Sequence, residues 1–391
     1  MNNINLELLA VDGKARVNKV KINNHEFNTP IFMPVATRGS IKSVNLQQLS
    51  DTKLILGNTY HLYLRPGLDI IKNFGGLHEY INWDKLILTD SGGFQGWSIP
   101  NSQTDDGILF KNIYDGTKFL MTPELSIHIQ ETLNSNIAMI LDQLIDINAS
   151  KDMQKQAIIN TNIWAKKARD IHNNKNQSLF GIIQGGKYKD LREISTKNML
   201  ENDFNGYAIG GLAIGETEKE RSEIVSFTTD LLPVDKLRYV MGVGDIKSLI
   251  NLIELGVDMF DCVWPARIAR HGKIINRAKF FNLKNSKYKN IKDPLVEDCN
   301  CNTCLNFSTS YMRHLLINEP TSSWQFLTIH NIYQTQNIIN EVRESILNSD
   351  FDNYKEKLLN EWNHNFTSTN YCIYYLLRYF VYSSKKETKK T

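Results

Sequence analysis

Two aspartates in this sequence have the type and setting that chemistry at a sugar carbon requires. Asp90 ends the strand-like run LILTDS (86–91) and is followed by a glycine turn, and Asp261 lies in the run DMFDCV (258–263). Glycines after a strand let the backbone approach a bound ligand closely. One carboxylate can attack an anomeric carbon while the other transfers protons. The pair therefore predicts a site that breaks and forms bonds at such a carbon.

A third carboxylate in the same motif, Asp258, is expected to have another role. Side chains alternate between the two faces of a strand, so a residue three positions before Asp261 points the other way. We interpret Asp258 as a cap or an ion-pair partner.

Asp142 and Gln184 match the hydrogen-bonding edge of a guanine-like ring. They stand near the ends of the runs AMILDQ (138–143) and LFGIIQGG (179–186). A carboxylate accepts from a ring N–H and an amino group, and a carboxamide both donates and accepts. The glycine turns QGG and GGL offer backbone N–H groups to a ring carbonyl, although glycine after a strand is also typical of a plain turn.

A cysteine cluster near the C-terminus predicts a metal site. Cys299, Cys301 and Cys304 in CNCNTC are followed by His330, in the arrangement C-x-C-x₂-C-x₂₅-H. Three thiolates and one imidazole complete a tetrahedral Zn²⁺ site with no open position, so the metal is expected to be structural. The alternative is three unrelated buried cysteines.

The positions of these residues depend on a scaffold of eight short apolar runs separated by segments of helical periodicity. Continuous apolar runs are required by strands that are buried on both faces, as in a parallel sheet. Eight of them predict a (β/α)₈ TIM barrel, in which the carboxyl ends of the strands carry the active site; a doubly wound open sheet is the alternative. The runs are 30–35, 54–58, 86–91, 138–143, 179–186, 207–212, 239–244 and 258–263.

Composition excludes several classes of protein. The 391 residues are 41% hydrophobic and 22% charged, which rules out wholesale disorder. The formal net charge of +3 is too small to indicate a nucleic-acid partner by itself, but it leaves room for a local basic face. With neither a secretory signal nor an apolar run long enough for a membrane span, the chain is expected to be cytoplasmic.

Taken together, the motifs resemble a known family. NTYHLYLRPG, LTDSGGFQ, FGIIQGG, YAIGGLAIGE, RYVMGVG, DMFDCVWPAR and the cysteine–histidine cluster occur in the order found in tRNA-guanine transglycosylases. The resemblance covers roughly residues 5–362. It implies a TIM-barrel domain over 1–362 with an inserted C-terminal zinc subdomain at about 285–335, one structural Zn²⁺ per chain, and a tail, 363–391, outside the family pattern.

The resemblance also implies a role for each site residue. Asp261 matches the nucleophile that attacks ribose C1′, and Asp90 matches the general acid/base. Phe94 and Met241 would sandwich the base, and the Leu212 carbonyl, supported by Glu216, would accept from an exocyclic amine. The implied base-binding residues are Ser91, Phe94, Asp142, Gln184, Gly211, Leu212, Glu216 and Met241, with Arg267 and Arg270 contacting tRNA and Cys299, Cys301, Cys304 and His330 binding zinc.

The implied reaction exchanges the wobble guanine of the tRNAs for Asp, Asn, His and Tyr for a 7-deazaguanine, preQ1, in queuosine biosynthesis. The implied partners are tRNA, preQ1 and guanine, with no membrane. The spacing of the aromatic stripe Phe307, Tyr311 and His314 by itself favours core packing slightly, and the resemblance shifts the interpretation towards a homodimer face. Three other functions stay open: a transglycosylase that accepts queuine, a barrel glycosidase that acts on a sugar, and a non-catalytic partner subunit.

Three positions depart from the pattern of bacterial family members. Leu144 replaces a usual Cys, Ile214 a usual Val, and Ala266 a usual Thr. By the resemblance, Leu144 and Ile214 border the substituent at position 7 of the base. Because both are larger than a wall that admits queuine would allow, they favour preQ1.

Overall fold

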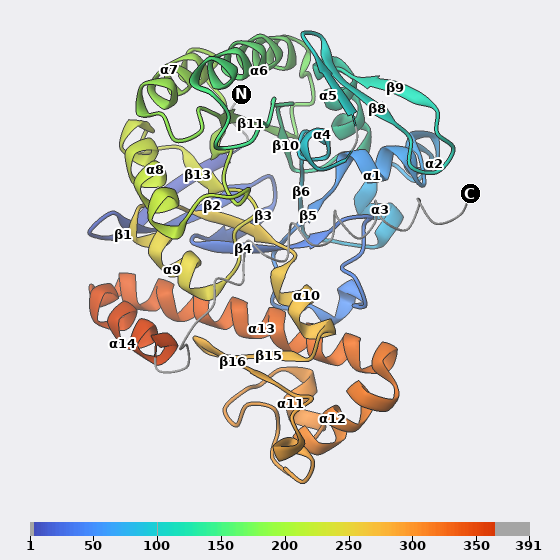
Figure 1. Cartoon of the computed structure of the whole chain (residues 1–391), viewed down its shortest axis with the longest axis vertical. Coiled ribbons are helices and arrows are strands. Elements are labelled where there is room, and N and C mark those ends of the chain that lie inside the picture. The colour runs from blue at the N-terminus through green and yellow to red at the C-terminus, as the bar shows by residue number, and fades with distance from the viewer. Residues whose placement is uncertain (1–3, 100, 364–391) are drawn as a thin grey trace.

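The eight apolar runs form the eight strands of a closed parallel barrel (Figure 1). The structure is a computed structural model that describes residues 4–99 and 101–363. In six of the strands every residue is buried, as strands covered on both faces require. The strands are β4 (Ile31–Ala36), β5 (Leu54–Gly57), β6 (Leu86–Thr89), β10 (Ile137–Met139), β11 (Ser178–Ile183), β12 (Gly206–Ile209), β13 (Leu237–Val240) and β14 (Met259–Cys262).

The barrel closes because its last strand pairs with its first. β14 runs parallel to β4, with Met259 opposite Ile31 and Cys262 opposite Pro34. Every other neighbouring pair is also parallel and joins successive barrel strands, with β7–β9 inserted between β6 and β10. The predicted TIM barrel is therefore confirmed, and the open doubly wound sheet was the wrong alternative.

Helices surround the barrel, and several of them begin at side-chain caps. Ser150 caps α6, Asp245 caps α9, and Thr217 forms a reciprocal capping box with Glu220 at the start of α8. The helices up to the last strand are α1 (Thr59–Leu64), α2 (Leu68–Asn73), α3 (Leu77–Ile81), α4 (Gln95–Ser98), α5 (Pro123–Leu133), α6 (Lys151–Ile171), α7 (Lys189–Glu201), α8 (Glu218–Leu231) and α9 (Ile246–Glu254), with a 3₁₀ turn at Leu46–Gln48.

An antiparallel sheet that the sequence patterns did not reveal precedes the barrel. It consists of β1 (Ile4–Asp12), β2 (Ala15–Ile22) and β3 (His25–Asn28). Arg16 on β2 donates to the carbonyls of Val234 and Lys236, just before β13, and its guanidinium pairs with Asp258, just before β14. The sheet thus contacts the amino ends of the barrel strands, opposite the predicted site.

A second insertion follows β6. The irregular segment 92–123 is expected to hold a small hairpin or a long loop, and it forms a three-stranded antiparallel sheet of β7 (Asn101–Thr104), β8 (Gly107–Lys111) and β9 (Lys118–Met121). Its apolar residues Ile108, Phe110 and Met121 are fully buried. The sheet follows the turn that carries Asp90, so it is an insertion at the carboxyl end of β6.

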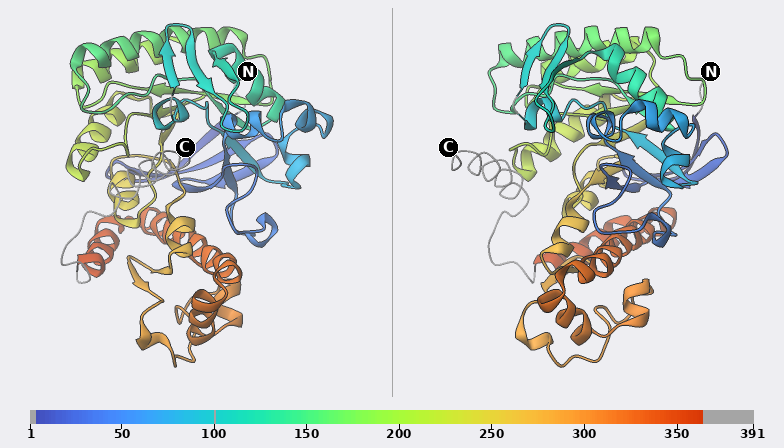
Figure 2. Two further views of the ribbon diagram at one scale, coloured as in Figure 1. Left: turned by 45° about the vertical axis from the view of Figure 1, so that its right-hand side comes forward. Right: turned by 90° about the vertical axis from the view of Figure 1, so that its right-hand side faces the viewer.

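A smaller subdomain leaves the barrel after β14 and projects from it (Figures 1 and 2). Helix α10 (Trp264–Arg270) leads into the hairpin β15 (Lys273–Asn276) and β16 (Lys279–Asn282), a 3₁₀ turn at Ser286–Tyr288, α11 (Asn302–Asn306) and α12 (Thr309–Asn318). The chain returns through the 28-residue α13 (Pro320–Leu347) and ends its described part in α14 (Phe351–Asn363). Within residues 4–99 and 101–363 no helix has both the length and the apolarity of a membrane span.

Candidate active site and metal centre

The predicted site residues converge on the carboxyl ends of the strands. Asp90 directly follows β6, and Gln184 directly follows β11. Parallel strands in a closed barrel bring their carboxyl ends to one face, and barrel enzymes have their active sites on that face. The same ends carry Asp142 after β10, Gly210 and Gly211 after β12, Met241 and Gly242 after β13, and Asp261 in β14.

The Asp261 carboxylate is held by two donors on one of its oxygens. The Tyr239 hydroxyl donates to Oδ1 at 2.5 Å, and the Gly242 N–H donates to the same oxygen at 2.8 Å. Burial raises the pKa of Asp261, although both hydrogen bonds oppose that rise. Burial and the neighbouring Asp261 raise the pKa of Tyr239 well above its ordinary value, so the phenol stays a donor. Oδ2 accepts no hydrogen bond from the described residues.

The Asp90 carboxylate has a different environment. Asn58 Nδ2 donates to Oδ2 at 2.5 Å, and the Thr59 and Gly92 N–H groups donate to Oδ1 at 2.9 and 3.2 Å. Burial, reinforced by the negative charge of Asp261, raises the pKa of Asp90 to about 7 despite these donors. A carboxyl with that pKa can release and take up a proton near neutral pH.

Asp142, Gln184 and Ser91 form one hydrogen-bonded group. Gln184 Nε2 donates to Asp142 Oδ2 at 2.6 Å, and Ser91 Oγ donates to Asp142 Oδ1 at 3.4 Å. Burial raises the pKa of Asp142 to about 6, with both donors acting against it. The predicted amide–carboxylate pair therefore exists, and it combines the acceptors and the carboxamide that the edge of a planar polar ring requires.

Glycines allow this group to lie against the backbone. A Cβ on Gly93 would stand 2.4 Å from Asp142 Oδ1, and one on Gly211 would stand 2.8 Å from Gln184 Oε1. Gly211 also has φ of +69°, a left-handed conformation that favours glycine. The two glycines are thus required by close packing against the polar pair.

Glu216 organises the turn that follows Gly211. Its side chain is almost fully buried and accepts from the N–H groups of Ala213 at 2.7 Å and Ile214 at 3.1 Å. Arg221 lies 3.6 Å away and balances its charge. Because Glu216 fixes the peptides after Leu212, it controls the direction of the Leu212 carbonyl.

An apolar wall borders this turn. Leu144, Leu212 and Ile214 are buried in one cluster, and Trp97 packs against it. The Phe94 ring is 38% exposed and lies 5.8 Å from the Trp97 ring. Met241 is half-buried. An aromatic ring this exposed at the carboxyl end of a barrel strand is available to a flat ligand.

The two arginines predicted to contact tRNA follow Asp261 in the chain. Arg267 and Arg270 lie on α10, directly after the strand of Asp261, and the Arg267 guanidinium forms no hydrogen bond or ion pair with the described residues.

Asp258 is fully buried, receives two hydrogen bonds from Arg16 at 2.6 and 2.9 Å, and accepts from the Arg238 N–H. It is confirmed as an ion-pair partner, at the opposite end of β14 from Asp261.

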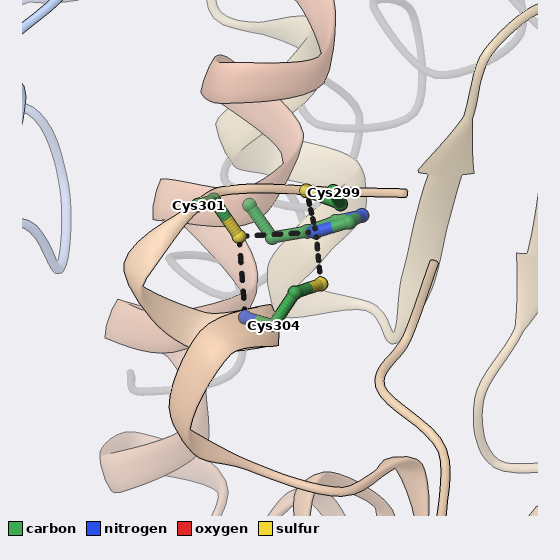
Figure 3. A group of neighbouring side chains, drawn as sticks. Cys299, Cys301 and Cys304 are labelled. Carbon is green, nitrogen blue, oxygen red and sulfur yellow. Dashed lines mark hydrogen bonds between the residues drawn. The ribbon is translucent and has the colours of Figure 1, made fainter. Parts of the chain in front are cut away.

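The four residues of the cysteine–histidine motif meet in one buried cluster (Figure 3). His330 Nδ1 lies 3.6 Å from Cys299 Sγ, 3.4 Å from Cys301 Sγ and 3.3 Å from Cys304 Sγ. Tetrahedral zinc with ordinary Zn–S and Zn–N bond lengths separates these atoms by roughly 3.5 Å. His330 Nε2 lies 2.9 Å from the Ile275 carbonyl, which directs Nδ1 at the cluster. The donor set fits a structural metal ion.

Metal removal gives the first testable prediction. Chelation, or Cys301→Ser, should release about one metal ion per chain and loosen the elements between α10 and α13, because the binding energy of a structural site, on the order of 10 kcal/mol, is also folding energy. Hydrogen exchange should rise in β15–α12 and stay low in the barrel strands. An unchanged exchange pattern after verified metal loss would contradict a structural role.

Three contributors to the site were missed in the sequence. Tyr239 reads as a core residue of a buried strand, and Asn58 as a helix cap, a role it also fills by accepting from the His61 N–H. Trp97 falls in an irregular segment that gives no periodicity. The NTYH motif was a usable signal for Asn58, since an amide before a helix at a strand end faces the same mouth as the carboxylates.

Comparison with known proteins gives one consistent result over nearly the whole chain. A family model described as "Queuine tRNA-ribosyltransferase" matches residues 12–364. A protein of that name from Dictyoglomus turgidum is 42% identical over 365 residues, which cover 91% of this chain and 94% of that protein. Relatives of the same name from Bacillus subtilis (41% over 356 residues; 90% and 93% covered) and Staphylococcus aureus (43% over 353; 89% and 93%) are equally similar. The matched region includes Asp90 and Asp261, the hydrogen-bonded group of Asp142, Gln184 and Ser91, and the cysteine–histidine cluster.

Proposed function

Because the chain belongs to the queuine tRNA-ribosyltransferase family of tRNA-guanine transglycosylases, we propose that it exchanges a guanine of tRNA through a covalent intermediate on Asp261. The observation that carries this proposal is the contrast between the two carboxylates at the barrel mouth. Asp261 is fixed through one oxygen, and Asp90 has a pKa of about 7. Family membership argues against the barrel glycosidase and the non-catalytic subunit.

The first half of the reaction breaks the bond to guanine. Oδ2 of Asp261 attacks ribose C1′, a C1′–O bond forms and the C1′–N9 bond breaks, with its electron pair going to guanine. Asp90, when protonated, gives its proton to the departing base. Tyr239 and the Gly242 N–H hold Oδ1 during the attack, and they stabilise the carboxylate again when it leaves.

The second half reverses these roles. Ionised Asp90 takes the N9 proton of the incoming base, N9 attacks C1′, and the ester bond to Asp261 breaks. Asp142, Gln184, Ser91 and the Gly211 N–H would bind the polar edge of either base, between Phe94 and Met241. Cys299, Cys301, Cys304 and His330 would hold a zinc ion that stabilises the subdomain, and a site closed by four protein ligands would offer no position to a reacting group.

We propose preQ1, rather than queuine, as the incoming base. Queuine carries a bulky cyclopentenediol on its 7-aminomethyl group, and the wall of Leu144, Ile214 and Trp97 is already packed. The Leu212 carbonyl, with Glu216 behind it, suits a small primary ammonium. An apolar wall rejects an oversized ligand strongly but a smaller one weakly, so guanine remains an exchangeable substrate.

Enlarging the wall tests the choice of base. Leu144→Val with Ile214→Gly should admit queuine and change the use of guanine by less than about tenfold, because the polar contacts to the ring are retained. The measurement is competition of preQ1 and queuine against labelled guanine on one tRNA. Better competition by queuine than by preQ1 against the unmodified enzyme would contradict the proposal.

The tRNA set and the oligomeric state are proposals of the same kind. We propose the tRNAs for Asp, Asn, His and Tyr as substrates, with Arg267 and Arg270 beside the anticodon.

Tyr311 is 45% exposed on α12, and its ring lies 5.6 Å from Phe307 and 6.5 Å from His314, an arrangement that supports a homodimer face. The tail 363–391 lies outside the described residues, apart from Asn363.

The test of the proposed function is incorporation of labelled guanine into tRNA. Metal-loaded enzyme should incorporate label into unmodified tRNA without ATP, and preQ1 should then block further incorporation. No incorporation by metal-loaded, folded protein would refute the exchange reaction.

A further inference from the structure

A chain of three carboxamides joins the inserted sheet to the segment that carries Asp142 and Leu144. Gln103 lies on β7, Gln143 follows β10, and Asn160 lies on α6. The base-exchange reaction described above gives none of these side chains a role. We call the three residues the amide brace.

Each member of the amide brace is bonded at both ends of its carboxamide. Gln143 Nε2 donates to Gln103 Oε1 at 2.7 Å, and Asn160 Nδ2 donates to Gln143 Oε1 at 2.9 Å. At the outer end, Asn160 Oδ1 accepts from Gln156 Nε2 at 3.0 Å. A polar network whose members are all satisfied favours one arrangement, because breaking any bond leaves a donor or an acceptor without its partner.

Gln103 connects two segments that flank the predicted base site. Its Nε2 donates to the Leu144 carbonyl at 3.2 Å and to the Gly96 carbonyl at 3.3 Å. Leu144 belongs to the apolar wall, and Gly96 lies on α4 between Phe94 and Trp97. One carboxamide therefore fixes the main chain of the wall relative to the main chain beside the exposed Phe94 ring.

Helix α6 anchors the brace from behind. The Gln143 N–H donates to the hydroxyl of Thr161, which is fully buried, at 3.0 Å. The Trp164 indole N–H, also on α6, donates at 2.7 Å to the carbonyl of Asp105 in the turn that follows β7. The wall segment and the inserted sheet are thus held by the same helix, and the brace spans the distance between them.

We propose that the amide brace positions the apolar wall for the choice of incoming base, with Gln103 as a specificity-determining residue. This inference rests on the proposed function, because it concerns the base that replaces guanine. Gln103 is a positioning residue, since it acts through Leu144 and Gly96. Loss of its carboxamide removes a donor from the wall's main chain, and a wall that yields discriminates less against an oversized ligand.

Gln103→Met tests the proposal, because Met has nearly the size of Gln but lacks the amide. The ratio of kcat/KM for preQ1 to that for queuine should fall about tenfold, since the hydrogen bonds to both flanking segments are lost. The kcat for guanine exchange should change by less than about twofold, because the groups that hold Asp90 and Asp261 are retained. Both are measured on one tRNA with each base in turn.

A second variant and a local measurement support the same test. Gln103→Asn keeps an amide but is one methylene shorter, so it cannot reach both carbonyls and should lower the ratio in the same direction. Hydrogen exchange of peptides that cover 140–147 should rise in both variants, since the donor to the Leu144 carbonyl is lost or displaced.

The matched control is Gln130→Met. Gln130 is also a buried carboxamide, and it bonds to the main chain of Met139 in β10, donating to the carbonyl and accepting from the N–H, both at 2.8 Å. It supports the strand before Asp142 but makes no hydrogen bond to the wall among the described residues. Its replacement should lower Tm and leave the ratio of preQ1 to queuine unchanged.

The outcomes separate this inference from the proposed function. A lower Tm in Gln103→Met with an unchanged ratio would overturn the inference and leave Gln103 a purely structural residue. An equal fall of the ratio in Gln130→Met would overturn it too, because any loosening of the barrel would then suffice. If wild-type enzyme exchanges no guanine, the proposed function fails, and calorimetric Kd values for preQ1 and queuine decide the inference: an unchanged Kd ratio in Gln103→Met would overturn it, and a reduced preference for preQ1 would support it.

Discussion

Asp261→Asn is expected to abolish the covalent tRNA–protein adduct and to lower guanine exchange on the order of 10⁴-fold or more. The amide has almost the size of the carboxylate, so the change leaves no cavity, and it can still accept from Tyr239 and the Gly242 N–H. Only the nucleophilic oxygen is lost. Denaturing gel electrophoresis of enzyme mixed with labelled tRNA measures the adduct.

The matched control for this variant is Asp258→Asn. Asp258 lies three residues away but at the other end of β14, where Arg16 pairs with it. Its replacement should destabilise the fold, because it leaves a buried guanidinium without its counter-charge, while adduct formation by the folded fraction continues. An adduct in Asp261→Asn protein would place the nucleophile elsewhere, with Asp90 the next candidate.

Asp90→Asn is expected to lower exchange by about 10² to 10⁴-fold, the usual contribution of a positioned general acid or base. In the wild type, kcat/KM for adduct formation should fall above pH 7, because Asp90 must be protonated to assist guanine departure and its pKa is about 7. The acid limb should lie above the ordinary range of aspartate, since the pKa of Asp261 is also raised. A profile that is flat from pH 6 to 9 would contradict this assignment.

Asp90→Asn should also stabilise the folded protein, and more so at pH 8 than at pH 5. A carboxyl whose pKa is higher in the folded than in the unfolded state binds its proton more tightly when folded, so its contribution to stability is lost as pH rises from about 4 to about 7. Asp90→Asn should therefore raise Tm at pH 8, by about 2 to 4 °C, and raise it less at pH 5. An equal or lower Tm at pH 8 would contradict a costly ionised Asp90.

The sequence predicts the barrel well because strands buried on both faces leave continuous apolar runs, as LILG and SLFGII do. It does not reveal the N-terminal sheet, since β1 exposes Leu8, Leu9 and Val11 and has a register shift between Leu8 and Ala10. Its apolar residues therefore follow neither a strand nor a helix period, and only pairing with β2 defines the strand.

The sequence likewise reveals some residues of the site and not others. Asp90, Asp142 and Gln184 are recognisable because polar residues at the ends of apolar runs are unusual, and their hydrogen bonds confirm that Asp142 and Gln184 act as a pair. Tyr239 is not recognisable, because a tyrosine in a buried strand is typical of a core, and its role depends on one hydroxyl reaching Asp261 across to the next strand. Cross-strand geometry of this kind is absent from a linear pattern.

The most direct test of the account is to locate the ribose in the covalent adduct. Enzyme trapped with tRNA is denatured, digested with nuclease and protease, and analysed by tandem mass spectrometry for a ribose-linked peptide. The account predicts a single modified residue, Asp261, in the peptide containing DMFDCVWPAR. Modification of Asp90 or Asp258, or release of guanine without any linked peptide, would contradict it.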